Sequence, residues 1–114
     1  MRIAFVNAGF IHDKHEYTAR ITCVDTENRN VIPTTYCLTS NDCSYLVKKV
    51  KYIIEHDYIE EVILADRMSD NYRVENMLKQ NGYMYRTALV DNTDVLTELW
   101  RKVMRNLREE EWTE

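Results

Sequence analysis

The 114-residue sequence has few of the residues that bend or break a backbone, with 2 glycines and 1 proline. Collagen-like, disordered and flexible-linker chains are rich in these residues, so their scarcity excludes those classes. The sequence also has no glycine-rich loop of the kind that binds nucleotide phosphates, and no Ser-His-Asp arrangement. The chain length is typical of one domain, and we find no internal repeat.

Long apolar runs and an excess of positive charge are also missing. No run approaches the roughly 20 apolar residues of a membrane helix, so no membrane partner is expected. The formal net charge is −4. Four glutamates in the last six residues supply it, because removing them from the 19 acidic residues leaves 15, equal to the 15 lysines and arginines. A strongly basic nucleic-acid-binding surface is therefore excluded, whereas a local basic patch is not.

Cysteines are few and carry no metal-ligand spacing. Cys23, Cys37 and Cys43 are an odd number, and the chain enters a predicted strand at once, without a visible signal peptide. We expect unpaired, mostly buried thiols and a cytoplasmic location.

The first third of the chain predicts three strands. Residues 2–9 read as a central strand that ends at Asn7-Ala8-Gly9. Polar and apolar residues alternate over residues 17–24, which is typical of a half-buried strand. The third strand is predicted over residues 31–38 and contains Pro33, which cannot donate to a strand ladder, so this strand should lie at the sheet edge. Short polar links between the strands favour an antiparallel meander.

The rest of the chain alternates helices and strands. A capping box of Thr39 and Asp42 is predicted to open a helix that ends at residues 56–57. The apolar run 61–65 predicts a buried strand that delivers Asp66. A second helix is predicted from residues 69–70 to Gly82, and a fifth strand over residues 83–90. A last helix opens at residues 91–94. The predicted buried positions of the first two helices are Leu46, Val47, Val50, Ile53, Ile54, Val74, Met77 and Leu78.

This βββαβαβα order predicts an α/β fold. Right-handed crossovers place the fourth strand parallel to the first and beside it, with the fifth strand outside. The prediction is a mixed five-stranded sheet in the order 3-2-1-4-5, with helices on both faces. Residues 1–108 form the predicted single domain, and residues 109–114 form an acidic C-terminal tail.

The element order, the Asn-x-Gly motif and the placing of two aspartates resemble the ribonuclease H-like superfamily. This superfamily includes ribonucleases H, RuvC-type resolvases and retroviral-type integrases. The resemblance implies two divalent metal ions held by about four carboxylates. Asp66 and Asp94 match the acids that follow the fourth strand and open the last helix. Asn7 stands where the first-strand acid is expected, and the first-helix region Cys43-Ser44-Tyr45 offers no acid.

The amide at position 7 changes what such a site can do. Two adjacent Mg²⁺ ions need anionic oxygens between them, and an amide supplies one neutral oxygen. Our leading hypothesis is a catalytically degenerate protein that acts by binding and needs no cofactor. Its expected partner is a protein or a nucleic acid, and its expected origin is a phage or a mobile element. One alternative is a Mg- or Mn-dependent nuclease with a reduced site of Asn7, Asp66 and Asp94, helped by Asp91 or Asp42. Another is a structural or homodimeric subunit built on an exposed strand edge.

Each candidate residue also has an ordinary structural interpretation. Asn7 could orient a substrate or form a turn before Gly9. Asp66 could bind metal or cap a helix, and Asp94 is typical of a helix N-terminus. Two basic strips could contact nucleic-acid phosphates or could be solvated helix faces. The residues of these strips are Lys48, Lys49, Lys51, Arg101, Lys102 and Arg105.

Overall fold

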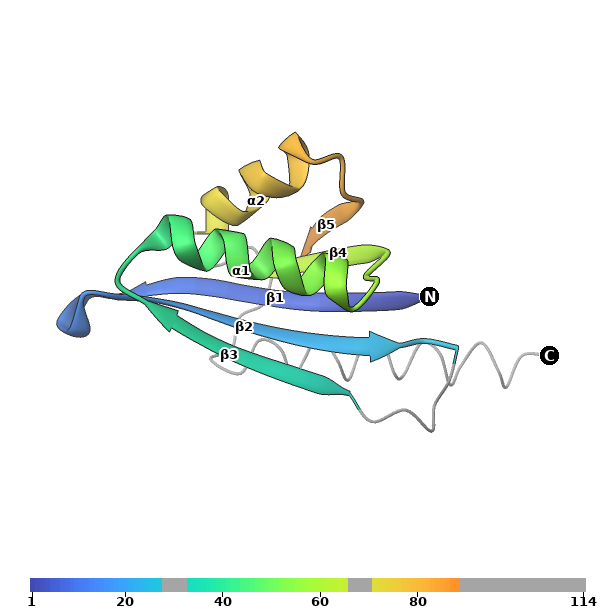
Figure 1. Ribbon diagram of the computed structural model, residues 1–114, viewed down its shortest axis with the longest axis horizontal. Coiled ribbons are helices and arrows are strands. Elements are labelled where there is room, and N and C mark those ends of the chain that lie inside the picture. Colours follow the sequence, from blue (N-terminus) through green and yellow to red (C-terminus); the bar gives the residue numbers. More distant parts are fainter. Residues whose placement is uncertain (28–32, 66–70, 89–114) are drawn as a thin grey trace.

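The computed structural model describes residues 1–27, 33–65 and 71–88 (Figure 1). The strands are β1 (Arg2–Ile11), β2 (Glu16–Asp25), β3 (Thr34–Ser40), β4 (Glu61–Ala65) and β5 (Tyr85–Ala88). The helices are α1 (Cys43–His56), between β3 and β4, and α2 (Asn71–Gln80), between β4 and β5. A short 3-10 turn (His12–Lys14) joins β1 to β2. Neither of these two helices has the length and apolar character needed to cross a membrane.

The strands form one sheet in the order β3-β2-β1-β4-β5. The first three strands pair antiparallel, whereas β4 runs parallel to β1 and β5 parallel to β4. The predicted mixed sheet and its strand order are confirmed. β3 lies at an edge as predicted, although Pro33 precedes the strand and is not one of its residues. Within the described residues both helices cover the same face, and the predicted last helix lies outside them.

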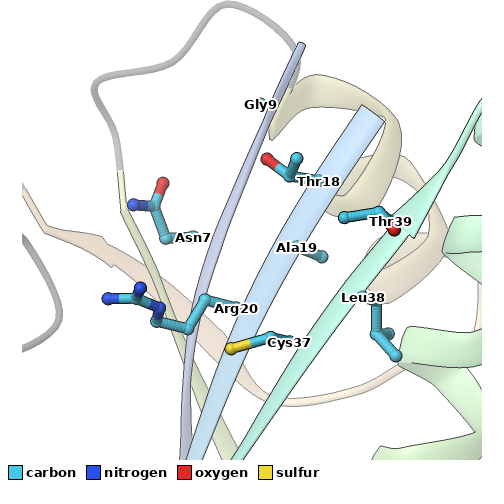
Figure 2. Close-up of a pocket in the computed structure, with 8 residues that line it drawn as sticks. All are labelled: Asn7, Gly9, Thr18, Ala19, Arg20, Cys37, Leu38 and Thr39. Carbon is cyan, nitrogen blue, oxygen red and sulfur yellow. The ribbon is translucent and has the colours of Figure 1, made fainter. Parts of the chain in front are cut away.

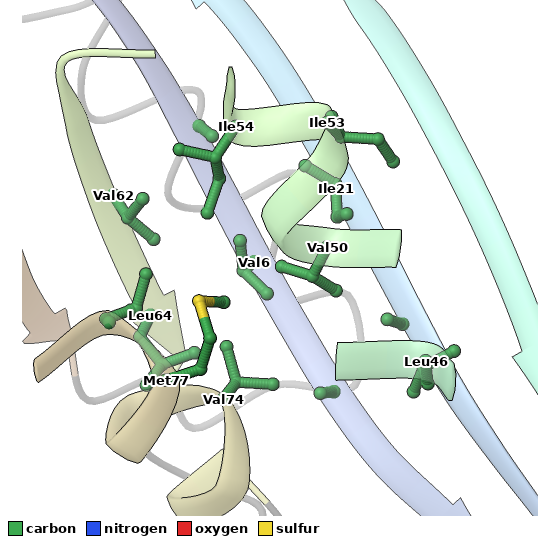
Figure 3. Packing of buried hydrophobic residues seen from close by; sticks show 14 of the residues in the cluster. Val6, Ile21, Leu46, Val50, Ile53, Ile54, Val62, Leu64, Val74 and Met77 are labelled. Carbon is green, nitrogen blue, oxygen red and sulfur yellow. The ribbon is translucent and has the colours of Figure 1, made fainter. Parts of the chain in front are cut away.

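The core lies between the sheet and the two helices (Figure 3). Every second residue of β1 and β2 points to the helices, and apolar residues recur at helical spacing along α1 and α2. Phe5 points to the other face and is also fully buried. The residues that meet in the helix-side core include Ala4, Val6, Ala8, Ala19, Ile21, Cys23, Leu46, Val50, Ile53, Ile54, Val62, Leu64, Val74, Met77 and Leu78.

Two predicted local features are wrong. β1 continues to Ile11, so Asn7 and Gly9 lie inside a strand and Asn7 is not a turn residue. The chain turns later, at the 3-10 segment and His15, which has a φ of 49°. Thr39 also belongs to a strand, where it pairs with Thr18, so it forms no capping box with Asp42. In both cases strand pairing with the long β2 outweighs the local turn and cap preferences.

Other boundaries shift by a few residues. β3 begins at Thr34, after Pro33, and β5 begins at Tyr85. α2 ends at Gln80, and Gly82 follows with a φ of +68°, in the left-handed region that glycine favours after a helix. The predicted stop at this glycine is therefore confirmed.

A polar cluster closes the C-terminal end of α1. Asp57 is its C-cap, and the Arg2 side chain donates to the Asp57 backbone oxygen. The Tyr36 hydroxyl donates to Asp57 Oδ2 over 2.9 Å, and His56 Nδ1 lies 2.9 Å from Oδ1. Burial, followed by the nearby Asp57 carboxylate, raises the pKa of the Cys23 thiol to about 12. Cys23 is thus a protonated core residue at neutral pH.

Candidate functional site on the sheet

Asn7 lies on the sheet face that points away from α1 and α2, because its neighbours Val6 and Ala8 point toward them. Asn7 pairs with Arg20 of β2, and Arg20 pairs with Cys37 of β3. These three residues form a row across three strands. Paired residues on one sheet face have Cβ atoms about 5 Å apart, so Asn7 and Arg20 can act on one ligand.

The next row along the strands continues the site. Gly9, Thr18 and Thr39 pair in the same way and on the same face. The two rows border a pocket of about 370 Å³ (Figure 2). In Figure 2 the Asn7 amide and the Arg20 guanidinium extend to the same side of the strands. The residues that line the pocket are Asn7, Gly9, Thr18, Ala19, Arg20, Cys37, Leu38 and Thr39.

The pocket carries positive charge and no carboxylate. Arg20 is exposed, and it forms no ion pair with any residue of the described ranges. The other polar groups of the lining are one amide, two hydroxyls and the unpaired, exposed thiol of Cys37. Guanidinium, amide and hydroxyl groups can all donate hydrogen bonds, so the arrangement suits an anionic ligand.

The same arrangement does not fit the Mg or Mn pair of an active ribonuclease H-like site. Asn7 offers one neutral oxygen, and Arg20 places a positive charge beside it. At about 6 Å, a unit charge and a divalent ion repel each other by about 1–6 kcal/mol, depending on how well solvent screens them. The described residues contain no group of three or more His, Cys, Asp or Glu side chains that could hold a metal ion. The predicted ligands Asp66 and Asp94, and the helper Asp91, lie outside the described residues.

Asp42, the other predicted helper, has a structural task. It is the N-cap of α1, and its carboxylate accepts a hydrogen bond from the Ser44 backbone nitrogen over 3.0 Å. This bond satisfies one of the unpaired donors at the start of the helix.

The predicted phosphate-binding lysines lie on the helix side of the sheet, away from the Asn7 pocket. Lys48 and Lys49 are exposed on α1, and Lys51 pairs with Glu55 over 3.9 Å. Their predicted partners Arg101, Lys102 and Arg105 lie outside the described residues. Sequence reasoning missed Arg20. Its alternation with apolar neighbours showed that it faces away from the core, but only the strand register shows that it stands beside Asn7.

No family model matches the chain, and no curated protein matches it. One similar solved structure is the catalytic core domain of BIV integrase, with a TM-score of 0.49 and 11% identity over 94% of this chain. Another is the simian T-cell lymphotropic virus intasome in complex with PP2A regulatory subunit B56 gamma, with a TM-score of 0.44 and 7% identity over 95% of this chain. The chain spans 64% and 41% of those two chains. The ribonuclease H-like fold is confirmed by the order and directions of the five strands.

Proposed function

We propose that this ribonuclease H-like domain is catalytically degenerate and binds the phosphate backbone of nucleic acid in the Asn7 pocket. The observation that carries the proposal is the row in which the Arg20 guanidinium stands beside an amide at the position of the expected acid. A guanidinium binds phosphate with two parallel hydrogen bonds and keeps its charge at any physiological pH. The amide and the hydroxyls of Thr18 and Thr39 add neutral donors, which are common in phosphate contacts.

Binding is tested with labelled duplex DNA, branched DNA and RNA–DNA hybrid by fluorescence anisotropy. We expect Arg20→Gln to weaken binding about 10- to 150-fold, since a hydrogen bond to a charged group contributes about 1.5–3 kcal/mol. The slope of log K against log salt concentration should fall by about 0.9 for the lost phosphate contact. Arg20→Lys keeps the charge and should recover part of the affinity.

Arg86→Gln is the matched control, because Arg86 lies on β5 and pairs with Glu61 over 3.0 Å, outside the pocket. It removes the same charge from the chain. Equal weakening by Arg20→Gln and Arg86→Gln, or no binding by the unchanged protein, would contradict the proposal.

The nuclease alternative makes the opposite prediction in the same samples. We expect no Mg- or Mn-dependent cleavage of RNA–DNA hybrid or branched DNA. Metal-dependent cleavage that Asp66→Ala abolishes would replace the binding proposal with a reduced two-metal site. The homodimer alternative is tested separately by light scattering, where a mass twice that of the chain would support it.

A further inference from the structure

Two cations on the helix side of the sheet each lie between two aromatic rings. Lys49 Nζ is 5.5 Å from the centroid of the Tyr45 ring and 5.9 Å from that of Tyr52. Arg73 Cζ is 5.7 Å from the ring centroids of both Tyr17 and Tyr72. These distances are within the range of cation–π attraction.

The rings on the two helices are open to solvent. Tyr45, Tyr52 and Tyr72 are 51%, 59% and 53% exposed. The ring of His56, one turn after Tyr52, stacks on it with centroids 5.4 Å apart and an interplanar angle of 24°. Tyr45, Lys49, Tyr52 and His56 follow one another at intervals of three or four residues, so they form one stripe along α1.

A groove of about 380 Å³ lies between α1 and α2, beside this stripe. Lys48 and Arg73 supply its charge, and neither forms an ion pair within the part of the chain that the structure describes. No carboxylate lines the groove. Its lining residues are Cys43, Ser44, Val47, Lys48, Arg73, Asn76, Met77 and Gln80.

Arg73 belongs both to the groove and to the Tyr17–Tyr72 pair. Lys48 lines the groove and lies three residues after Tyr45 and four before Tyr52, so it is their neighbour on the surface of α1. Rings and cations therefore follow one another across the helix layer. We call this surface the helix path, defined as Tyr17, Tyr45, Lys48, Lys49, Tyr52, His56, Tyr72 and Arg73.

We propose that the helix path binds single-stranded nucleic acid. Phosphates lie against Lys48 and Arg73 in the groove, and unpaired bases stack on the exposed tyrosine rings. Proteins that bind single strands combine these two features, a positive groove and aromatic platforms. A duplex keeps its base faces stacked and hidden, so it can use the cations but not the rings. An acidic peptide likewise matches the cations and leaves the rings without a stacking partner.

This inference goes beyond the proposed function and does not depend on it. The helix path lies on the helix side of the sheet, whereas Arg20 and Asn7 lie on the other face. Each site is thus tested by its own substitutions.

The test measures binding of a labelled oligothymidylate of about 20 nucleotides to the full chain by fluorescence anisotropy. The variant Tyr45→Leu/Tyr52→Leu keeps apolar side chains that suit a helix but removes two rings. We expect binding to weaken by about 5- to 150-fold for each stacked base that is lost. Lys48→Gln/Arg73→Gln should lower the slope of log K against log salt concentration by about 1.4, at about 0.7 per contact with a single strand.

Tyr58→Leu is the control, because Tyr58 is 81% exposed and lies outside the helix path. It should bind like the unchanged protein, and circular dichroism should show that every variant is folded. Unchanged binding by the double tyrosine variant would overturn the inference, even if Arg20→Gln weakened binding. In an Arg20→Gln background, which removes the guanidinium of the Asn7 pocket, equal competition by unlabelled duplex would also overturn it. Displacement of the oligonucleotide by polyglutamate would indicate an acidic protein partner instead, and a dimer lost in the tyrosine variant would indicate a second copy of the chain.

Discussion

Replacing Asp57 with asparagine should destabilise the protein at neutral pH and have little effect in acid. The Asp57 side chain is 11% exposed. Burial opposes its ionisation, but hydrogen bonds from His56 and Tyr36 outweigh the burial and lower the pKa of the Asp57 carboxyl. Asp57→Asn keeps the shape of the side chain and removes the charge that these donors favour.

The magnitude follows from the two bonds. A hydrogen bond to a charged group contributes about 1.5–3 kcal/mol. The His56 ring is mostly exposed, so solvent screens its share, and the bond from the Tyr36 hydroxyl dominates. We expect Asp57→Asn to lower the free energy of unfolding by about 1–3 kcal/mol at pH 7.

The sign of the pH dependence follows from the lowered pKa. The unfolded chain has an ordinary aspartate pKa near 3.9, above that of the folded state. The stabilisation is therefore complete above about pH 4 to 5 and is lost as the pH falls through the folded pKa. The difference between the unchanged protein and Asp57→Asn should narrow below about pH 4.

Urea unfolding followed by circular dichroism at pH 7, 5 and 3 measures this difference. Glu60→Gln is the control, since Glu60 is exposed and its side chain forms no ion pair among residues 1–27, 33–65 and 71–88. Tyr36→Phe should lower the free energy of unfolding by about the contribution of the lost hydrogen bond. In the double variant with Asp57→Asn it should lower that free energy little further, because both changes remove the same bond. A difference of equal size at pH 7 and pH 3 would refute the reasoning, because an ionised carboxylate would then not be its source.

Two further substitutions test the core and the Asn7 pocket. Because Ile54 is 1% exposed in the core, Ile54→Ala should lower the free energy of unfolding, measured in urea, by about 2–5 kcal/mol. Ile54→Val should lower it by about 0.5–1.5 kcal/mol. Equally small losses for both variants would show that the surrounding core closes over the cavity. Asn7→Asp should raise the free energy of unfolding by about 0.2–1 kcal/mol at pH 7 through the cross-strand pair with Arg20. Calorimetry should detect no Mn²⁺ binding by Asn7→Asp unless Arg20→Gln is added, and tight binding by the single variant would contradict the role of Arg20.

The sheet could be predicted because its strands carry strong and different patterns. The alternation around Ile21 marks a half-buried strand, and the continuous run of β4 marks a strand buried on both faces. Pro33 indicated the correct edge, although it precedes β3. Together with the right-handed crossover rule, these patterns lead to one order. The spacing of the buried residues in α1 and α2 was equally clear, and the structure buries all but Val47 of the predicted positions.

The site could not be predicted to the same extent, because its chemistry depends on register. Asn7 and Arg20 are 13 positions apart, and a slip of one residue would place Arg20 on the other face of the sheet. Local propensity was also misleading, since Asn-x-Gly favours a turn and yet lies inside β1. Pairing between distant strands decides the conformation of such positions, and the local pattern of one sequence does not reveal the register of that pairing.

The pairing of Asn7 with Arg20 also predicts that one substitution at position 7 would not create a metal site. A carboxylate at position 7 would stand beside the guanidinium, because the Cβ atoms of a cross-strand pair are about 5 Å apart, and their charges would cancel. Two divalent ions bring four positive charges, which a neutral pair does not offset. A working site therefore needs an acid at position 7 and the loss of the positive charge at position 20, in addition to the remaining carboxylates. With an amide at position 7 and a guanidinium at position 20, this row of the sheet favours an anion over a metal ion.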